Sequence, residues 1–308
     1  MSKEFKFFLI GLGFPFLFFA LNISKDCLEN YFYAQISQPL EKIVFVKVPP
    51  PKPKFDLQAK AAISVEIDKN GAEKIIFNKN INQPLPIASL TKLMTAVIVL
   101  ENENYDLKNT LIAISKEAAE QENVPNYGNL DLEIGKNFNL EQLLDLMLIY
   151  SSNDAAWALS EAIKTENFVE KMNQKATQLG LENTHFSNPT GLDPENFYYH
   201  PPTQNHFNYS TAKDLIKLAQ YILKSHPLIF EITLKKGPYP IENGFSDLTL
   251  AGNQKETGWK TGYTEEADGC ALLVLRGENK NIVNVILGAE SPEARIEEMQ
   301  KLIDWLNL

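Results

Sequence analysis

Apolar and polar positions alternate near both ends of the chain, and this pattern predicts β-strands there. Residues 61–78 (AAISVEIDKNGAEKIIFN) alternate on both sides of Asn70 and Gly71, a pair typical of a tight β-hairpin. Later strand-like runs and a closing helix occupy residues 257–264, 270–277, 281–289 and 292–306. Early and late strands must therefore pair with one another if they are to form one sheet.

Between these strands the apolar positions follow a helical spacing. The helical segments fall at residues 140–150, 155–163, 168–180 and 211–223. Ser210 is the expected cap of the last of them, and residues 93–100 are apolar enough to predict a helix buried on all sides. The pattern predicts an α/β sandwich of the α+β class, with a helical subdomain at about residues 103–225, and not a doubly wound fold.

Residues 1–22 do not belong to this domain. Lys3 and Lys6 precede an uncharged apolar run at residues 7–21, which is the pattern of an export signal. Because no small-residue cleavage site follows the run, a retained signal-anchor is expected in preference to a cleaved signal peptide. Either form predicts that the rest of the chain lies outside the cytoplasm.

A proline-rich segment separates this signal from the globular domain. Residues 23–54 end in VPPPKPK, whose prolines favour a stiff, extended linker that lies next to the membrane. The globular domain is therefore expected to cover residues 55–308.

The composition excludes some classes of function. The net charge of −10 and pI near 5.1 argue against a nucleic-acid partner, and no long basic run offsets them. Cys27 and Cys270 are the only cysteines, and their settings predict free thiols. The four histidines are scattered and form no ligand cluster, so neither a metal nor another cofactor is expected.

Ser89 and Lys92 open the buried helix in the run ASLTKLMTAVIVLE. Residues at i and i+3 share a helix face, so the lysine amine can reach the serine hydroxyl. Burial, the helix dipole and a second cation each lower the pKa of a lysine, and a neutral amine can take the serine proton. The backbone N–H of Ser89 can also bind an oxyanion. Taken alone, the pair is more often a serine N-cap beside a lysine that reaches solvent.

Two other polar clusters interrupt the apolar pattern. In YSSNDAA, Ser151 and Asn153 could relay a proton and hold a substrate amide, although such residues also cap helices. In GWKTGYT, Lys260 and Thr261 could bind a carboxylate, and the following glycine would let a substrate backbone approach the strand. An ordinary strand with a surface lysine has the same pattern.

The three clusters together, in this order, form the motif set of penicillin-interacting enzymes. With LPIASLTKLMTA, MLIYSSNDAA, THFSNPTGLD, YSTAKDL and GWKTGYTEEADGC, residues 58–290 resemble the low-molecular-mass penicillin-binding proteins. These are serine-type D-Ala-D-Ala carboxypeptidases similar to peptidase family S11. The resemblance implies a β-lactamase/transpeptidase-like fold, with a central, mostly antiparallel sheet flanked by helices.

The resemblance also implies a reaction. Ser89 would be the acylated nucleophile, Lys92 its base and Ser151 the carrier of a proton to the leaving amine. The substrate would be a peptidoglycan stem pentapeptide, which loses its terminal D-alanine before the acyl-enzyme is hydrolysed. β-Lactams would acylate Ser89 and leave slowly.

Substrate contacts are implied in the same way. Asn153 would bind the peptide, Lys260 would set the local field and Thr261 would bind the terminal carboxylate. The backbone N–H groups of Ser89 and Tyr263 would form the oxyanion hole. The implied compartment, beside the cell wall, agrees with the N-terminal segment, which would then anchor the enzyme in the membrane.

Several features depart from the family pattern. Many members carry a second, β-rich domain and a C-terminal anchor, whereas this chain stops after its last helix, which favours the retained N-terminal anchor. Residues 194–208 are longer than the usual link, and their His200 and His206 are expected to lie in a surface loop. Asp268 is expected to bring a carboxylate near Lys260.

Other functions remain open at this point. His185 is expected to have a packing role, because the serine–lysine pair leaves no vacancy for another base. A class A β-lactamase is disfavoured because no glutamate-x-x-leucine-asparagine run lies between Ser151 and Lys260. A D,D-endopeptidase with the same residues stays possible, as does a non-catalytic scaffold that binds the cell wall.

Overall fold

The computed structural model describes residues 29, 30, 33, 55–102, 106–121, 132–163, 167–193, 207–235, 255–277 and 279–307. The chain divides into two units, Met1–Lys54 and Phe55–Leu308. The predicted membrane segment and nearly all of the predicted linker lie outside the described residues, as do His200, His206 and Cys27. Within the described part of the chain, no helix combines the length and apolarity that a bilayer crossing needs.

The second unit is built on a five-stranded antiparallel sheet in the order β2-β1-β9-β8-β7. Its strands are β1 (Ala61–Asp68), β2 (Glu73–Lys79), β7 (Lys255–Thr264), β8 (Asp268–Arg276) and β9 (Lys280–Ala289). The hairpin predicted for the first two strands is confirmed, and Gly71 takes the positive φ of +83° that its turn requires. Pairing of β1 with β9, from Ala61 opposite Leu287, joins the two ends of the chain as predicted.

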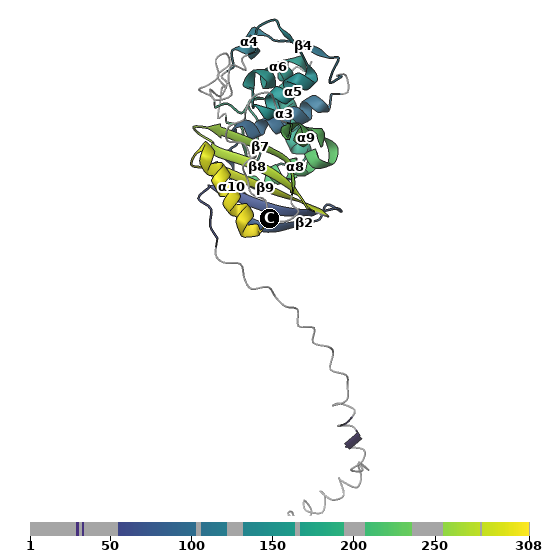
Figure 1. Ribbon diagram of the computed structural model, residues 1–308, viewed down its shortest axis with the longest axis vertical. Helices are drawn as coiled ribbons and strands as arrows, with labels where there is room; N and C mark the ends of the chain where they lie inside the picture. The colour runs from purple at the N-terminus through teal and green to yellow at the C-terminus, as the bar shows by residue number, and fades with distance from the viewer. Residues whose placement is uncertain are drawn as a thin grey trace, which may run out of the picture. The chain divides into compact units, whose positions relative to one another are not determined.

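Both faces of the sheet are buried. Along β8, Cys270 and Leu272 point to one hydrophobic layer, while Ala271 and Leu273 point to the other, because successive side chains alternate across a strand. Helix α10 (Pro292–Leu306) covers the second layer and packs on β8 and β9. Figure 1 shows α10 lying across the sheet, with the helical part of the unit gathered beyond the β7 edge.

The remaining elements connect the sheet to this helical part. They are β3 (Leu85–Pro86), β4 (Leu111–Ala113), α4 (Lys116–Ala119), β5 (Asn137–Asn139), α5 (Leu140–Ile149), α6 (Asn153–Ala162), α7 (Phe168–Gln178), β6 (Tyr209–Ser210), α8 (Ala212–Ser225) and α9 (Leu228–Thr233). Although the sequence placed α8 in the helical insert, it packs on β1 and β9 of the sheet.

The cap predicted for α8 is wrong by one residue. Thr211, with an extended backbone, accepts a hydrogen bond from Asp214 N at 3.0 Å, while Ser210 belongs to β6 and pairs with Leu85. Because α8 begins at Ala212, Thr211 occupies the N-cap position, and the Ser210 hydroxyl instead lies 2.7 Å from Thr184 Oγ1.

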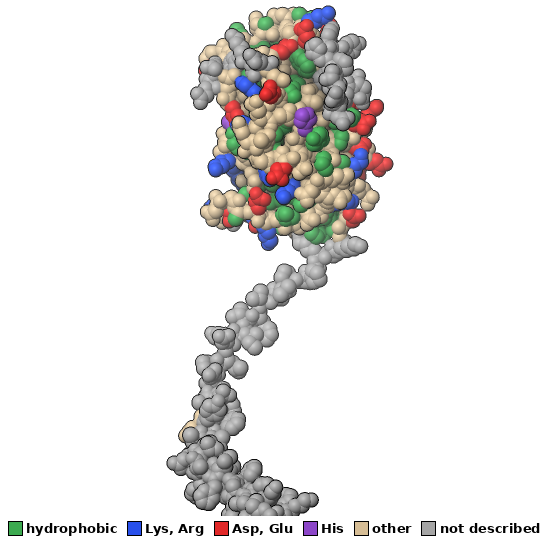
Figure 2. Space-filling view, turned by 180° about the vertical axis from the view of Figure 1, so that it is seen from behind, with side chains coloured by type: hydrophobic (Ala, Val, Ile, Leu, Met, Phe, Trp, Pro, Cys, Tyr) green, Lys and Arg blue, Asp and Glu red, His purple; other side chains and the backbone are tan. Residues whose placement is uncertain are grey.

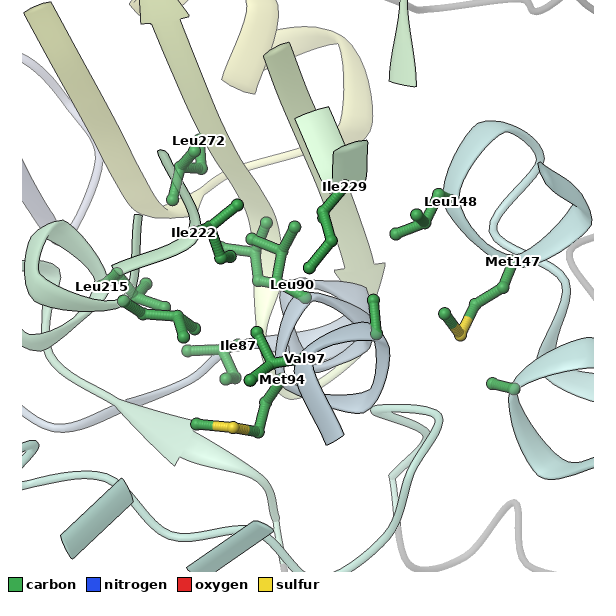
Figure 3. Close-up of a cluster of buried hydrophobic side chains, with 14 of the residues drawn as sticks. Ile87, Leu90, Met94, Val97, Met147, Leu148, Leu215, Ile222, Ile229 and Leu272 are labelled. Carbon is green, nitrogen blue, oxygen red and sulfur yellow. The ribbon is translucent and has the colours of Figure 1, made fainter. Parts of the chain in front are cut away.

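The helix that follows Ser89 lies at the centre of the unit. A short 3₁₀ turn, η1 (Ala88–Leu90), leads into α3 (Thr91–Leu100), whose residues from Thr91 to Val99 are all buried, as predicted. Figure 3 shows Leu90, Met94 and Val97 of this segment surrounded by side chains from several other elements. The surrounding side chains come from β8, α8, α9 and α5: Leu272, Leu215, Ile222, Ile229, Met147 and Leu148. This packing holds the start of α3 rigidly between the sheet and the helical part.

Candidate active site

Ser89 and Lys92 face each other at the start of α3. Lys92 Nζ lies 2.7 Å from Ser89 Oγ, so the amine does reach the hydroxyl. The same nitrogen donates to Asn153 Oδ1 and to the carbonyl oxygen of Thr190, both at 2.6 Å. Lys92 is fully buried, and thus does not reach solvent as an ordinary surface lysine would.

Burial lowers the pKa of Lys92 well below its usual 10.5, and the nearby charge of Lys260 lowers this pKa further. The pKa of Lys260 is itself lowered to about 7, first by burial and then by the charge of Arg295. A neutral Lys92 amine keeps a lone pair that can accept the Ser89 proton. The burial that disfavours the charged amine therefore also increases the fraction of Lys92 that is neutral and able to accept a proton.

Ser151 and Asn153 come from the break between α5 and α6. Ser151 has a positive φ of +62°, and Lys260 Nζ donates to its Oγ at 3.0 Å. Ser152 is the residue that caps α6, because its Oγ accepts from Ala155 N at 3.1 Å. Helix capping therefore accounts for Ser152 alone. Ser151 contacts Lys260, and Asn153 contacts Lys92. A strained backbone at such a position is typical of a functional site.

The third cluster lies on β7, the edge strand beside η1. Lys260 Nζ also donates to the carbonyl oxygen of Thr261 at 2.9 Å, and both residues are buried. A Cβ on Gly262 would lie 2.8 Å from Ser89 N, so glycine allows the strand to approach Ser89. Tyr263 follows on the same strand with 42% of its surface exposed. All three predicted clusters thus meet around Ser89.

Two elements of the site escaped the sequence reasoning. Arg295 of α10 is buried, and its Nη1 donates to the carbonyl oxygen of Gly262 at 2.8 Å. Thr190 contributes a backbone carbonyl, which any residue type could supply. Helical spacing predicted only that Arg295 belongs to a helix, and no sequence signal reveals a carbonyl.

The loop that carries Thr190 packs directly against Ala88 and Ser89. Gly191 has a φ of +91°, and a Cβ there would overlap the carbonyl oxygen of Ala88, which also has a positive φ, +44°. Asn208 was expected in a surface loop, but it is buried and donates to Thr91 Oγ1 at 3.0 Å. Its side-chain amide is held inside the domain, where it connects this loop to α3.

The structure corrects the expectation for Asp268 and agrees with the one for His185. Asp268 pairs with Lys60 at 2.8 Å and lies opposite Thr264 in the ladder, at the end of the hairpin. Its carboxylate is therefore directed to Lys60 and not to Lys260. His185 is exposed and its ring lies against that of Tyr209, while its backbone bridges the same residue. The ring contact with Tyr209 agrees with the packing role expected for His185.

Cys270 is a buried free thiol, as predicted. Burial raises its pKa to about 11, which keeps the sulfur protonated and unreactive at neutral pH.

The geometry supports acyl transfer. Ser89 Oγ lies beside the Lys92 amine, whose pKa is lowered, Ser151 Oγ lies beside the Lys260 amine, and the glycine-containing edge strand borders both. These are the parts needed for a serine nucleophile with a lysine base and a bound, extended peptide. A serine nucleophile with a lysine base does not require a Ser-His-Asp arrangement.

Comparisons with known proteins agree with this chemistry. The family model described as D-alanyl-D-alanine carboxypeptidase, peptidase S11, matches residues 46–291. The D-alanyl-D-alanine carboxypeptidase DacF of Bacillus subtilis is 33% identical over 80% of this chain, which spans 62% of DacF, less than two-thirds of its length. A D-alanyl-D-alanine endopeptidase of Pseudomonas aeruginosa is 30% identical, over 84% of this chain and 81% of its own.

A solved structure is similar as well. Penicillin-binding protein D2 of Listeria monocytogenes, in its cefotaxime-bound form, superposes with a TM-score of 0.68 and 28% identity. The match covers 82% of this chain and 98% of that one. The fold is therefore that of the penicillin-binding proteins, as the resemblance implied. The chain belongs to the peptidase S11 family of D-alanyl-D-alanine carboxypeptidases.

Proposed function

We propose that this chain is a serine D,D-carboxypeptidase that removes the terminal D-alanine from peptidoglycan stem pentapeptides. The observation that carries the proposal is the contact of the buried Lys92 amine with Ser89 Oγ at 2.7 Å. Family membership supplies the substrate class. On the face in Figure 2, acidic and basic side chains are interspersed, which fits a small-peptide substrate better than a nucleic acid.

The reaction begins with transfer of the Ser89 proton to the neutral Lys92 amine, while Oγ attacks the carbonyl carbon of the penultimate D-alanine. The carbonyl oxygen becomes an oxyanion that receives hydrogen bonds from the backbone N–H groups of Ser89 and Tyr263. As the C–N bond breaks, the proton returns through Ser151 to the leaving amine. Water then hydrolyses the ester and restores Ser89.

Substrate binding uses the other motif residues. Thr261 binds the terminal carboxylate, and Lys260 supplies a positive field there whenever it is protonated. Asn153 holds the peptide amide, and the glycine after Thr261 lets the peptide lie along the edge of β7. A β-lactam follows the same first step, because its strained amide occupies the place of the scissile bond.

The test is intact-mass analysis of the protein after brief exposure to penicillin, with Ser89→Ala as the control. We expect a stable penicilloyl adduct on Ser89 that the variant does not form. Absence of an adduct from folded protein, without penicillin hydrolysis, would move the proposal to the non-catalytic scaffold. Rapid hydrolysis without an adduct would indicate a β-lactamase.

Endopeptidase activity is the second candidate, because the endopeptidase relative is covered over 81% of its length. Both activities use the same nucleophile and differ in the leaving group. D-Alanine release from a pentapeptide, measured beside cleavage of a cross-linked dimer, separates them. We expect release of D-alanine to be the faster reaction.

We further propose that residues 1–22 anchor the enzyme in the membrane, with the catalytic unit on the extracytoplasmic side. Support comes from the lysines and the apolar run of this segment, and from the absence of a small-residue cleavage site. The full chain is expected in the membrane fraction with its N-terminal mass intact. Recovery of a shortened chain in the soluble fraction would instead indicate a cleaved signal.

A further inference from the structure

Asn188 lies outside the three motifs, yet its side chain organises the loop beneath Ser89. It is 2% exposed, and its Oδ1 accepts from Thr190 N at 3.0 Å, from Thr190 Oγ1 at 3.0 Å and from Gly191 N at 2.7 Å. Its Nδ2 donates to the carbonyl oxygen of Leu192 at 3.1 Å. One amide therefore fixes the backbone on both sides of the Thr190 carbonyl.

That carbonyl decides how the Lys92 amine is oriented. A neutral amine has two N–H groups and one lone pair, and Lys92 Nζ has three oxygen neighbours. The Thr190 carbonyl can only accept, and Asn153 Oδ1 also accepts, so these two oxygens take both N–H groups. The lone pair is then left facing Ser89 Oγ, which is the orientation that a base needs.

A second buried amide connects this loop to the nucleophile helix. Asn208 Nδ2 donates to the carbonyl oxygen of Asn188 at 3.0 Å and to Thr91 Oγ1 at 3.0 Å. Its Oδ1 accepts from Ser187 N at 2.6 Å and from Asn188 N at 3.1 Å. Because Thr91 lies between Ser89 and Lys92 in sequence, the asparagine pair fixes the loop relative to both.

We propose that Asn188 is a positioning residue for the base: by fixing the Thr190 carbonyl, it aims the Lys92 lone pair at Ser89. This inference rests on the proposed function, since it assigns a role in acylation. Asn188 touches no reacting atom and acts only through Thr190 and Lys92. Its removal should therefore change the rate and pH dependence of acylation more than penicillin affinity.

The test compares two variants of Asn188 by the rate constant of penicillin acylation between about pH 5 and 9. Asn188→Ala loses the acceptor, and a misplacement of about 1 Å lowers such a rate by about 10²-fold. The protonated Lys92 amine also loses its carbonyl partner, which lowers the pKa of Lys92. The acid limb of the pH–rate profile, where the rate rises with pH, therefore moves to lower pH. Asn188→Asp keeps the acceptor oxygen but adds a negative charge, so more of the plateau is retained and the acid limb moves to higher pH.

Asn173→Ala is the matched control. Its side-chain amide makes two hydrogen bonds of 2.8 Å with the backbone N–H and carbonyl of Phe186, at the start of the same loop. Neither bond involves Thr190, which contacts Lys92. We expect it to lower stability without moving the acid limb. Unchanged acid limbs in both Asn188 variants, with a plateau equal to that of Asn173→Ala, would overturn the inference. If the wild-type protein itself forms no adduct, the proposed function fails first, which separates the two results.

Discussion

Replacing Lys92 with methionine is expected to slow acylation of Ser89 by penicillin about 10⁴-fold or more, while the unit stays folded. Methionine has similar length and fills the buried space without an amine. Ser89 then keeps its proton, because the remaining neighbours of Lys92 Nζ, a carbonyl and an amide oxygen, are far weaker bases. The rate of adduct formation followed by mass spectrometry, with circular dichroism as a check on folding, measures this loss.

The pH dependence of acylation by the wild-type enzyme provides a second test of Lys92. With the usual lysine pKa of 10.5, only about one amine in 3,000 would be neutral at pH 7. Since burial and Lys260 lower the pKa of Lys92 well below that value, acylation should rise with pH and level off far below pH 10. A rate that still climbs steeply above pH 9 would contradict a lowered pKa.

Lys175→Met is the control for Lys92→Met. Lys175 is also largely buried, with its Nζ 2.6 Å from Glu101 Oε2, at the opposite end of α3 from Ser89. This variant loses one lysine and one partly buried ion pair and leaves the site unchanged. Acylation is expected to remain near the wild-type rate. A Lys92→Met enzyme within tenfold of this control would rule out Lys92 as the base.

Gly191→Ala is expected to destabilise the unit by about 3 kcal/mol or more and to slow acylation strongly. Its φ of +91° is unfavourable for alanine, and the added methyl would overlap the carbonyl oxygen of Ala88. Relief of this overlap requires movement of the Ala88 peptide, which precedes the nucleophile, or of the loop that holds the Thr190 carbonyl. Urea unfolding and the acylation rate measure the two consequences.

Gly180→Ala separates the steric effect from the backbone effect. Gly180 follows the C-cap of α7 with a φ of +66°, but no atom lies within 4 Å of its added Cβ. The free energy of unfolding should fall by about 1 kcal/mol, because of the positive φ alone, and the acylation rate should be unchanged. Equal losses in the two variants would mean that contact with Ala88 plays no part.

Much of the fold could be predicted because it depends on local patterns. The hairpin around Gly71, the late strands and α10 follow from apolar periodicity, which records the face that each segment buries. The bounds predicted for α10, residues 292–306, are those found. The cap of α8 was missed by one residue, because pairing of Ser210 with Leu85 is a long-range contact.

Within the site, the motif side chains could be named from the sequence, but their environments could not. Asp268 was expected near Lys260 because the two are close in sequence, yet the hairpin register carries its carboxylate to Lys60. Asn208 ends the segment 194–208, which was expected to form a surface loop, yet it is buried and bonded to Thr91 of α3. Neighbours in sequence separate, and distant residues meet, once the sheet is formed.

The sequence alone determined the class of fold, the three motifs and the family they resemble, because these are written in residue types and their local spacing. Only the tertiary structure decided that the amine of Lys92 is buried between Ser89, Asn153 and the Thr190 carbonyl. It also decided that Arg295 of the last helix holds the strand carrying Thr261. The reason is physical: the pKa of a buried amine and the direction of a carbonyl depend on every segment packed around them, and these segments are joined only by folding.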